Sequence, residues 1–134
     1  MMTMKKMYII VDDRTLDCFV TKKIIERIDE SQVLKIYNSA IEISNDIKLG
    51  NLHYEGLTVV FLDIMMPVMN GFQFVEEFET LPLNIQSKFK IIAMTTSLDN
   101  NDFQKILGYS SIIGLLRKPF DLKDVNDILN KIVE

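Results

Sequence analysis

The sequence has little from which a disulfide-bonded or transition-metal protein could be built. Of its 134 residues, only Cys18 is a cysteine and only His53 is a histidine, and tryptophan is absent. A single cysteine excludes an internal disulfide and a Cys-based zinc site, and a single histidine removes most histidine-based metal and acid–base designs. These absences indicate a reducing compartment, and we expect the protein to be cytoplasmic.

Long apolar runs and a strong charge of one sign are also missing. No run could span a membrane, and Met7–Val11, which follows Lys5 and Lys6, is too short for a signal peptide. The net charge is −4 without a basic block, which argues against nucleic acid as the main partner. With 48% hydrophobic residues, the composition is that of a globular protein, and we expect one domain over residues 1–134.

Five apolar runs alternate with stretches of helical periodicity. The runs are continuous, as is typical of parallel strands buried on both faces: Met7–Val11, Val33–Tyr37, Thr58–Leu62, Lys90–Met94 and Ile112–Leu116. The expected helices are Thr15–Ile28, Ser39–Lys48, Gly71–Glu79, Asn100–Leu107 and Leu122–Val133. We expect Asn38 or Ser39 to cap the second helix, Gly50 to close it and Asp121 to cap the last one. The pattern predicts an α/β fold with a flavodoxin-like doubly wound five-stranded parallel sheet, strand order 2-1-3-4-5, and five helices.

Polar side chains follow several of these strands. The first run ends in Asp12 and Asp13, the third in Asp63, the fourth in Thr95 and the fifth in Lys118. Because the first and third strands are neighbours in the predicted order, three carboxylates should meet at one edge, where they repel by about 4 kcal/mol per pair at 4 Å. Hard oxygen ligands favour Mg²⁺ as the neutralising ion. A cation, an ammonium and a hydroxyl around one carboxylate suit transfer of a phosphoryl group to that carboxylate.

Taken alone, each of these residues has a structural explanation. The alternatives are a cap of the first helix for Asp12–Asp13, a turn residue for Asp63, a strand residue for Thr95 and a strand end for Lys118. Their convergence on one edge of the sheet favours a functional site over four independent structural roles.

Four segments together resemble the receiver domain of response regulators over essentially the whole chain. They are Asp12–Asp13, Leu62–Gly71 (LDIMMPVMNG), Met94–Ser97 and Lys118–Phe120. The resemblance implies a phosphorylation-dependent signalling switch rather than a turnover enzyme. Its phosphoryl donor would be a sensor histidine kinase or a phosphotransfer protein, and its changed surface would control a protein target. No membrane or nucleic-acid partner is expected.

The same resemblance implies a role for each site residue. Asp63 would be the phosphoacceptor, Thr95 would bond a phosphoryl oxygen and Lys118 would pair with the phosphate. The implied Mg²⁺ ligands are Asp12, Asp13, Asp63 and the backbone carbonyl of Met65. The Lys118–Pro119 peptide bond is expected to be cis.

The sequence departs from the family pattern at three positions. Leu115 stands where an aromatic residue is usual, Asn70 replaces an aspartate, and Thr96 is larger than the usual small residue. Leucine cannot act as the aromatic rotor of the family. We therefore expect phosphorylation to reorder the segment Ser97–Gly108 instead.

Three other interpretations compete with a free-standing switch. Haloacid-dehalogenase-type phosphatases also use an aspartate nucleophile and Mg²⁺, but place the nucleophile after the first strand in an Asp-x-Asp pattern and carry a cap domain. A docking module that is never phosphorylated would have no need for the complete acidic set. The chain could also be cut from a hybrid kinase or a transcription factor, although Met1 and Glu134 look like natural limits.

Overall fold

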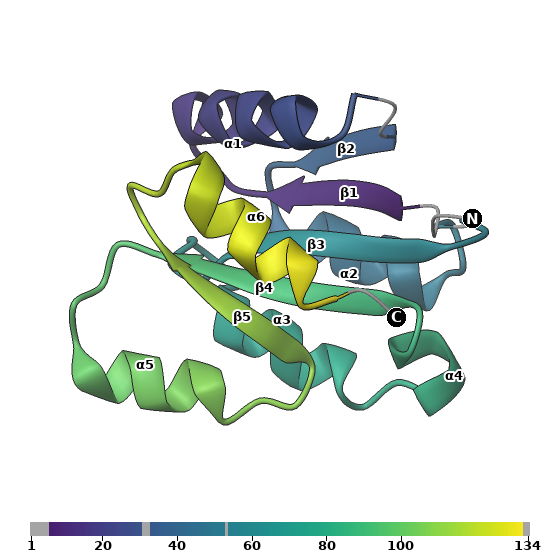
Figure 1. The fold of residues 1–134 in the computed structure, drawn as a ribbon. Helices are drawn as coiled ribbons and strands as arrows, with labels where there is room; N and C mark the ends of the chain where they lie inside the picture. The colour runs from purple at the N-terminus through teal and green to yellow at the C-terminus, as the bar shows by residue number, and fades with distance from the viewer. Residues whose placement is uncertain (1–5, 31–32, 53, 133–134) are drawn as a thin grey trace.

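The computed structural model describes residues 6–30, 33–52 and 54–132, and it contains a five-stranded parallel sheet with helices on both faces (Figure 1). The strands are β1 (Lys6–Val11), β2 (Val33–Tyr37), β3 (Leu57–Asp63), β4 (Phe89–Thr95) and β5 (Ile112–Arg117). Their order is β2-β1-β3-β4-β5, and each neighbouring pair is parallel. The predicted doubly wound sheet is therefore confirmed, and every strand end lies within one residue of its expected place.

The helices begin and end largely where the sequence predicts. They are α1 (Thr15–Ile28), α2 (Ala40–Lys48), α3 (Gly71–Phe78), α4 (Leu83–Gln86), α5 (Asn100–Leu107) and α6 (Leu122–Asn130). Ser39 caps α2 by accepting a backbone N–H, and Asp121 forms a capping box with Asp124 at the start of α6. Gly50 follows α2 at φ 73°, in the left-handed region that favours glycine. None of the helices in the described part of the chain is long and apolar enough to cross a membrane.

Two details differ from the expectation. Over the described residues the chain forms six helices rather than five, because α4 lies in the stretch 81–89, for which the sequence predicts a loop. This helix has 4 residues, too few to produce an apolar period, and the Gln86 amide holds it by donating to the carbonyls of Glu79 and Leu81. At the other end of the chain, α6 ends at Asn130, and the expected last residue, Val133, lies outside the described residues.

The sheet separates two apolar clusters because successive strand side chains point to opposite faces. Helices α1 and α6 cover one face, and α2, α3 and α5 cover the other (Figure 1). Every residue of the central strand β3 is buried, whereas the edge strand β2 is largely exposed. Buried central strands hold their carboxyl ends rigidly, so residues just after β1, β3 and β4 occupy fixed positions at one edge of the sheet.

Candidate functional site

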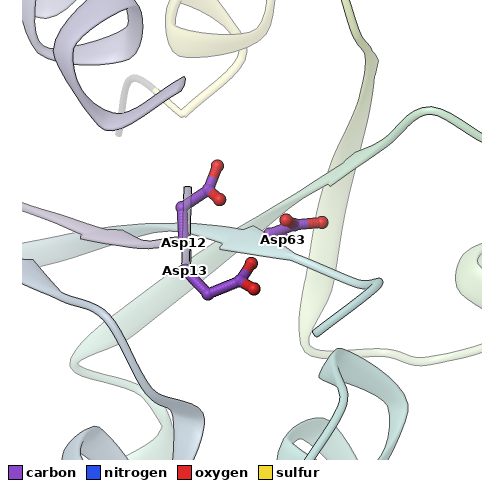
Figure 2. Close-up of side chains that lie close together, drawn as sticks. All are labelled: Asp12, Asp13 and Asp63. Atoms are coloured by element: carbon purple, nitrogen blue, oxygen red, sulfur yellow. The ribbon is translucent and has the colours of Figure 1, made fainter. Parts of the chain in front are cut away.

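Three carboxylates lie together at the carboxyl ends of β1 and β3 (Figure 2). Asp63 is the last residue of β3, and Asp12 and Asp13 follow β1, whose last residue, Val11, pairs with Leu62. One oxygen from each of the three aspartates lies within 4.8 Å of the others. Asp12 and Asp63 are buried, whereas Asp13 is exposed. The predicted convergence of the three side chains is therefore present.

The backbone of Asp12 is fixed by neighbours from two other elements. Its N–H donates to the carbonyl of Tyr37 at 3.0 Å. Its carbonyl accepts from the Asn38 amide at 3.0 Å and from the Cys18 thiol at 3.3 Å. The only cysteine of the chain thus helps to position an aspartate of the acidic cluster.

The interpretation of Asp12 as a helix cap captures part of its role. Arg14 occupies the N-cap position of α1, and its side chain makes no capping hydrogen bond. Asp12 Oδ1 accepts the N–H of Arg14 at 3.0 Å, while Oδ2 accepts from Lys118. One carboxylate therefore supports the start of α1 and faces the site at the same time.

Lys118 brings a positive charge to the cluster from the end of β5. Its backbone N–H donates to the Thr95 carbonyl at 2.8 Å, and the peptide bond to Pro119 is cis, as predicted. Its Nζ lies 2.7 Å from Asp12 Oδ2 and 3.4 Å from Asp63 Oδ2. Burial by itself lowers the pKa of Lys118, but hydrogen bonds and the charge of Asp63 outweigh it, so the pKa is raised.

Asp63 is held as a buried carboxylate among charged groups. Its Oδ1 accepts the N–H of Met65 at 3.0 Å. Burial raises the pKa of its carboxyl to about 6, the charge of Lys118 acts against this, and the charge of Asp12 acts with it. An acid in this environment is still mostly ionised at neutral pH, and it is poorly solvated, which favours reaction with an electrophile over hydration.

The loop after Asp63 is kept close to β3 by Gly71. A Cβ at this position would lie 2.7 Å from the Ile64 Cα, so only glycine fits. Asn70 caps α3 in a capping box with Gln73, so the replacement of the family's aspartate preserves the helix start.

Two other residues of this loop are notable. Val68 has φ 69°, which is strained for a β-branched residue. Met65 is 55% exposed beside the acceptor.

Thr95 is the last residue of β4 and follows Met94, the strand partner of Asp63. It is fully buried, and its Oγ1 accepts the N–H of Ser97 at 3.0 Å. A hydroxyl that accepts one hydrogen bond still has a hydrogen to donate, so Thr95 suits an anionic oxygen bound at Asp63. Thr96 is exposed, and with Pro119 and Phe120 it lines a cavity of about 290 Å³ that opens beside Lys118.

Sequence reasoning missed one charged residue of the site. Asp17, in the first turn of α1, places Oδ2 2.8 Å from the Lys118 Nζ. An acid in the first turn of a helix is common because it favours the positive end of the helix dipole, so nothing local marks it. Leu115 lies on β5, half-buried against the cluster on the α2, α3 and α5 side.

The site residues fit Mg²⁺. The cluster offers carboxylate oxygens only, which are the ligands that this ion prefers, and its net negative charge requires a cation. Among the residues that the structure describes, the cluster includes no nitrogen or sulfur ligand, and the Cys18 thiol donates to the Asp12 backbone carbonyl.

Comparison with known proteins gives a consistent result. The family model of the response regulator receiver domain matches residues 8–130. A receiver protein of Dyadobacter fermentans has a similar structure, with a TM-score of 0.81, 25% identity, and coverage of 94% of this chain and 96% of that one. The chemotaxis protein CheY4 of Vibrio cholerae has a TM-score of 0.73 at 21% identity, and the match covers 98% of this chain and 100% of CheY4.

A third structure similar to this chain carries a metal. The receiver domain of a sensor histidine kinase of Pseudomonas aeruginosa has a TM-score of 0.76 at 18% identity, and the match covers 95% of this chain and 96% of that domain. It was solved with a magnesium ion in its active-site cleft. No curated protein matches the chain.

Proposed function

This chain belongs to the family of response regulator receiver domains, which act as phosphorylation-dependent switches of two-component signalling, and we propose that Asp63 is its phosphoacceptor. One observation carries the assignment. Asp63 is a buried carboxylate in contact with Lys118 and with the other two aspartates of the acidic cluster. Thr95, one residue beyond the β4 partner of Asp63, supplies a hydroxyl on the opposite side from β1. We also propose that residues 1–134 act as one receiver domain in the cytoplasm.

In the proposed step, a carboxylate oxygen of Asp63 attacks the phosphorus of a phosphohistidine in a sensor kinase or phosphotransfer protein. The new O–P bond forms as the donor's N–P bond breaks, and the electron pair stays on the imidazole nitrogen. The imidazole leaves neutral when its other nitrogen carries a proton. Lys118 offsets the negative charge of the transferring group, and Thr95 donates a hydrogen bond to one of its oxygens.

Asp12, Asp13 and Asp63, with the backbone carbonyl of Met65, would hold Mg²⁺. The ion would supply positive charge that neutralises the crowded carboxylates and the phosphoryl oxygens. In its absence, Lys118 is the only cation that contacts two of these aspartates among the ion pairs of the described residues. This charge balance supports the proposal that phosphorylation requires a metal ion.

We propose that phosphorylation changes the conformation of residues 97–108 and the neighbouring surface, and that a protein target recognises this change. A cavity beside this segment is lined by residues of α5, β5 and α6, among them Phe103, Leu115 and Ile128. Leu98 and Leu107 are also strongly exposed in this segment. A phosphorylation-dependent shift of α5 would change this surface, in which apolar side chains lie beside Arg117 and Asp124, and such a surface suits a protein target.

Intact-protein mass spectrometry after incubation with acetyl phosphate and Mg²⁺ tests the assignment. Wild type should gain one phosphoryl group, and Asp63→Asn should gain none. Asp127→Asn is the matched control, because Asp127 pairs with Lys123 on the exposed face of α6 and should leave phosphorylation unchanged. Modification of Asp63→Asn to the wild-type extent contradicts the acceptor, and an unmodified wild type favours the docking-module alternative.

A further inference from the structure

Lys118 is shared among three carboxylates, and one of them lies outside the acidic cluster. Its Nζ is 2.7 Å from Asp12, 2.8 Å from Asp17 and 3.4 Å from Asp63. A lysine ammonium has three N–H donors, so these acceptors use its whole capacity. The phosphoryl-transfer step as described above makes no use of Asp17, although Asp17 approaches the ammonium more closely than the acceptor does.

The three acceptors differ in what else they can bind. Asp12 is fully buried and belongs to the acidic cluster, so a bound cation draws its charge away from Lys118. Asp17 extends from α1, and its side chain is 31% exposed, so water can replace its hydrogen bond at modest cost. Once the cluster holds a cation, Asp17 is the carboxylate that competes with an anion at Asp63 for the ammonium.

We propose that Asp17 is a positioning residue that holds the Lys118 ammonium on the α1 side of the site and competes for it with the phosphoryl group on Asp63. This inference rests on the proposed function. Its consequence is that Asp17 limits how tightly the phosphorylated state is held. With Asp17 included, four carboxylates surround one ammonium, so the site is more attractive to cations and less attractive to anions than the acidic cluster and Lys118 would be without Asp17.

Asp17→Asn tests the proposal, because it removes the charge and keeps the shape of the side chain. At saturating Mg²⁺, beryllofluoride, a noncovalent mimic of the phosphoryl group, should bind the variant roughly threefold to tenfold more tightly than wild type. Mg²⁺ alone should bind the variant more weakly, since one negative charge near the site is lost. Both titrations are followed by NMR of backbone amides, because the chain has no tryptophan. If Asp17 had only a structural role, its replacement would weaken the binding of both ligands. Tighter binding of beryllofluoride together with weaker binding of Mg²⁺ therefore identifies the positioning role.

Two control variants separate charge from position. Asp17→Glu keeps the carboxylate and should bind both ligands as wild type does. Glu26→Gln removes the same charge from α1 at a site where the partner is Lys23, at 3.6 Å, and should also match wild type. Asp17→Ala repeats the main test with a residue of higher helix propensity if the asparagine lowers stability.

The outcomes distinguish the two levels of the argument. Wild-type or weaker beryllofluoride binding by folded Asp17→Asn and Asp17→Ala overturns the role of Asp17 and leaves the acceptor assignment intact. Tighter binding by Glu26→Gln to the same extent also overturns it, because the effect would then come from net charge. A wild-type protein that takes up neither a phosphoryl group nor beryllofluoride removes the proposed function, and this inference with it.

Discussion

Replacing Asp63 by asparagine is expected to stabilise the metal-free fold while abolishing phosphorylation. Burial raises the pKa of the Asp63 carboxyl from 3.8 to about 6, so its ionised form is disfavoured in the folded state. The difference between these two pKa values means that ionised Asp63 lowers the stability of the fold by ~3 kcal/mol at a pH above both. Asparagine keeps an oxygen for the Met65 N–H but deprives Lys118 of one charged partner. We therefore expect Asp63→Asn to raise the free energy of unfolding by about 1–3 kcal/mol in EDTA near pH 7.5.

The gain should depend on pH in a defined direction. When the folded-state pKa of an acid lies above its unfolded-state value, stability is lost as the pH rises through this interval. The advantage of Asp63→Asn should therefore be complete above about pH 6 and shrink as the pH falls toward 3.8. Added Mg²⁺ should narrow the difference as well, because it stabilises wild type by binding the folded carboxylates.

Urea unfolding followed by circular dichroism measures this effect. For a slope of about 2 kcal/mol per molar urea, a gain of about 2 kcal/mol moves the midpoint by roughly 1 M. Asp127→Asn on the exposed face of α6 serves as the control and should change stability by less than about 0.5 kcal/mol. If Asp63→Asn is no more stable than wild type in EDTA near pH 7.5, the carboxylates are not in electrostatic conflict and the reasoning is wrong.

Four further outcomes are expected. Asp13→Ala should weaken Mg²⁺ binding and slow phosphorylation by acetyl phosphate roughly tenfold or more, and undiminished phosphorylation in EDTA would exclude the metal. Met65→Asn should speed loss of the phosphoryl group, measured by mass against time, because the apolar Met65 side chain beside the acceptor cannot orient a water; equal rates would show that Met65 does not control access. Val68→Asn should stabilise the fold by ~1 kcal/mol in urea unfolding, since asparagine tolerates the positive φ, and a loss of stability would argue against stored strain. Amide exchange with and without beryllofluoride should change over Ser97–Gly108, and changes confined to the loop after Asp63 would assign output to another face.

The sheet and the acidic cluster were predictable because they depend on strong, local signals. Buried parallel strands require continuous apolar runs, and the runs of β1 and β3 end where Asp12 and Asp63 stand. Once the strand order is fixed, parallel register carries these side chains to the same edge without any further information. The cis bond before Pro119 came from family resemblance alone, since most bonds before proline are trans.

What the sequence left out depends on tertiary contacts. The helix α4 has one turn and is fixed by side-chain bonds from Gln86 to preceding carbonyls, which no periodic pattern reports. Asp17 meets Lys118, 101 residues later, only because β5 ends at the same edge of the sheet at which α1 begins. Acids in the first turn of a helix are ordinary, so the function of this one becomes visible only in three dimensions.

The same geometry explains how a switch can work with Leu115 in place of an aromatic rotor. Thr95 Oγ1 accepts the N–H of Ser97, and the Ser97 hydroxyl donates to Asp102 on α5 at 2.7 Å and accepts the N–H of Asp99. When the Thr95 hydroxyl turns to a phosphoryl oxygen, it gains a hydrogen bond to a charged acceptor, which contributes about 1.5–3 kcal/mol. The turn also moves Oγ1 out of line with the Ser97 N–H and weakens that hydrogen bond. Because Ser97 is bonded to both the cap and the first turn of α5, this loss reaches the helix directly. We infer that the coupling from Asp63 to α5 runs through hydrogen bonds of the β4–α5 loop, where an aromatic side chain on β5 is not required.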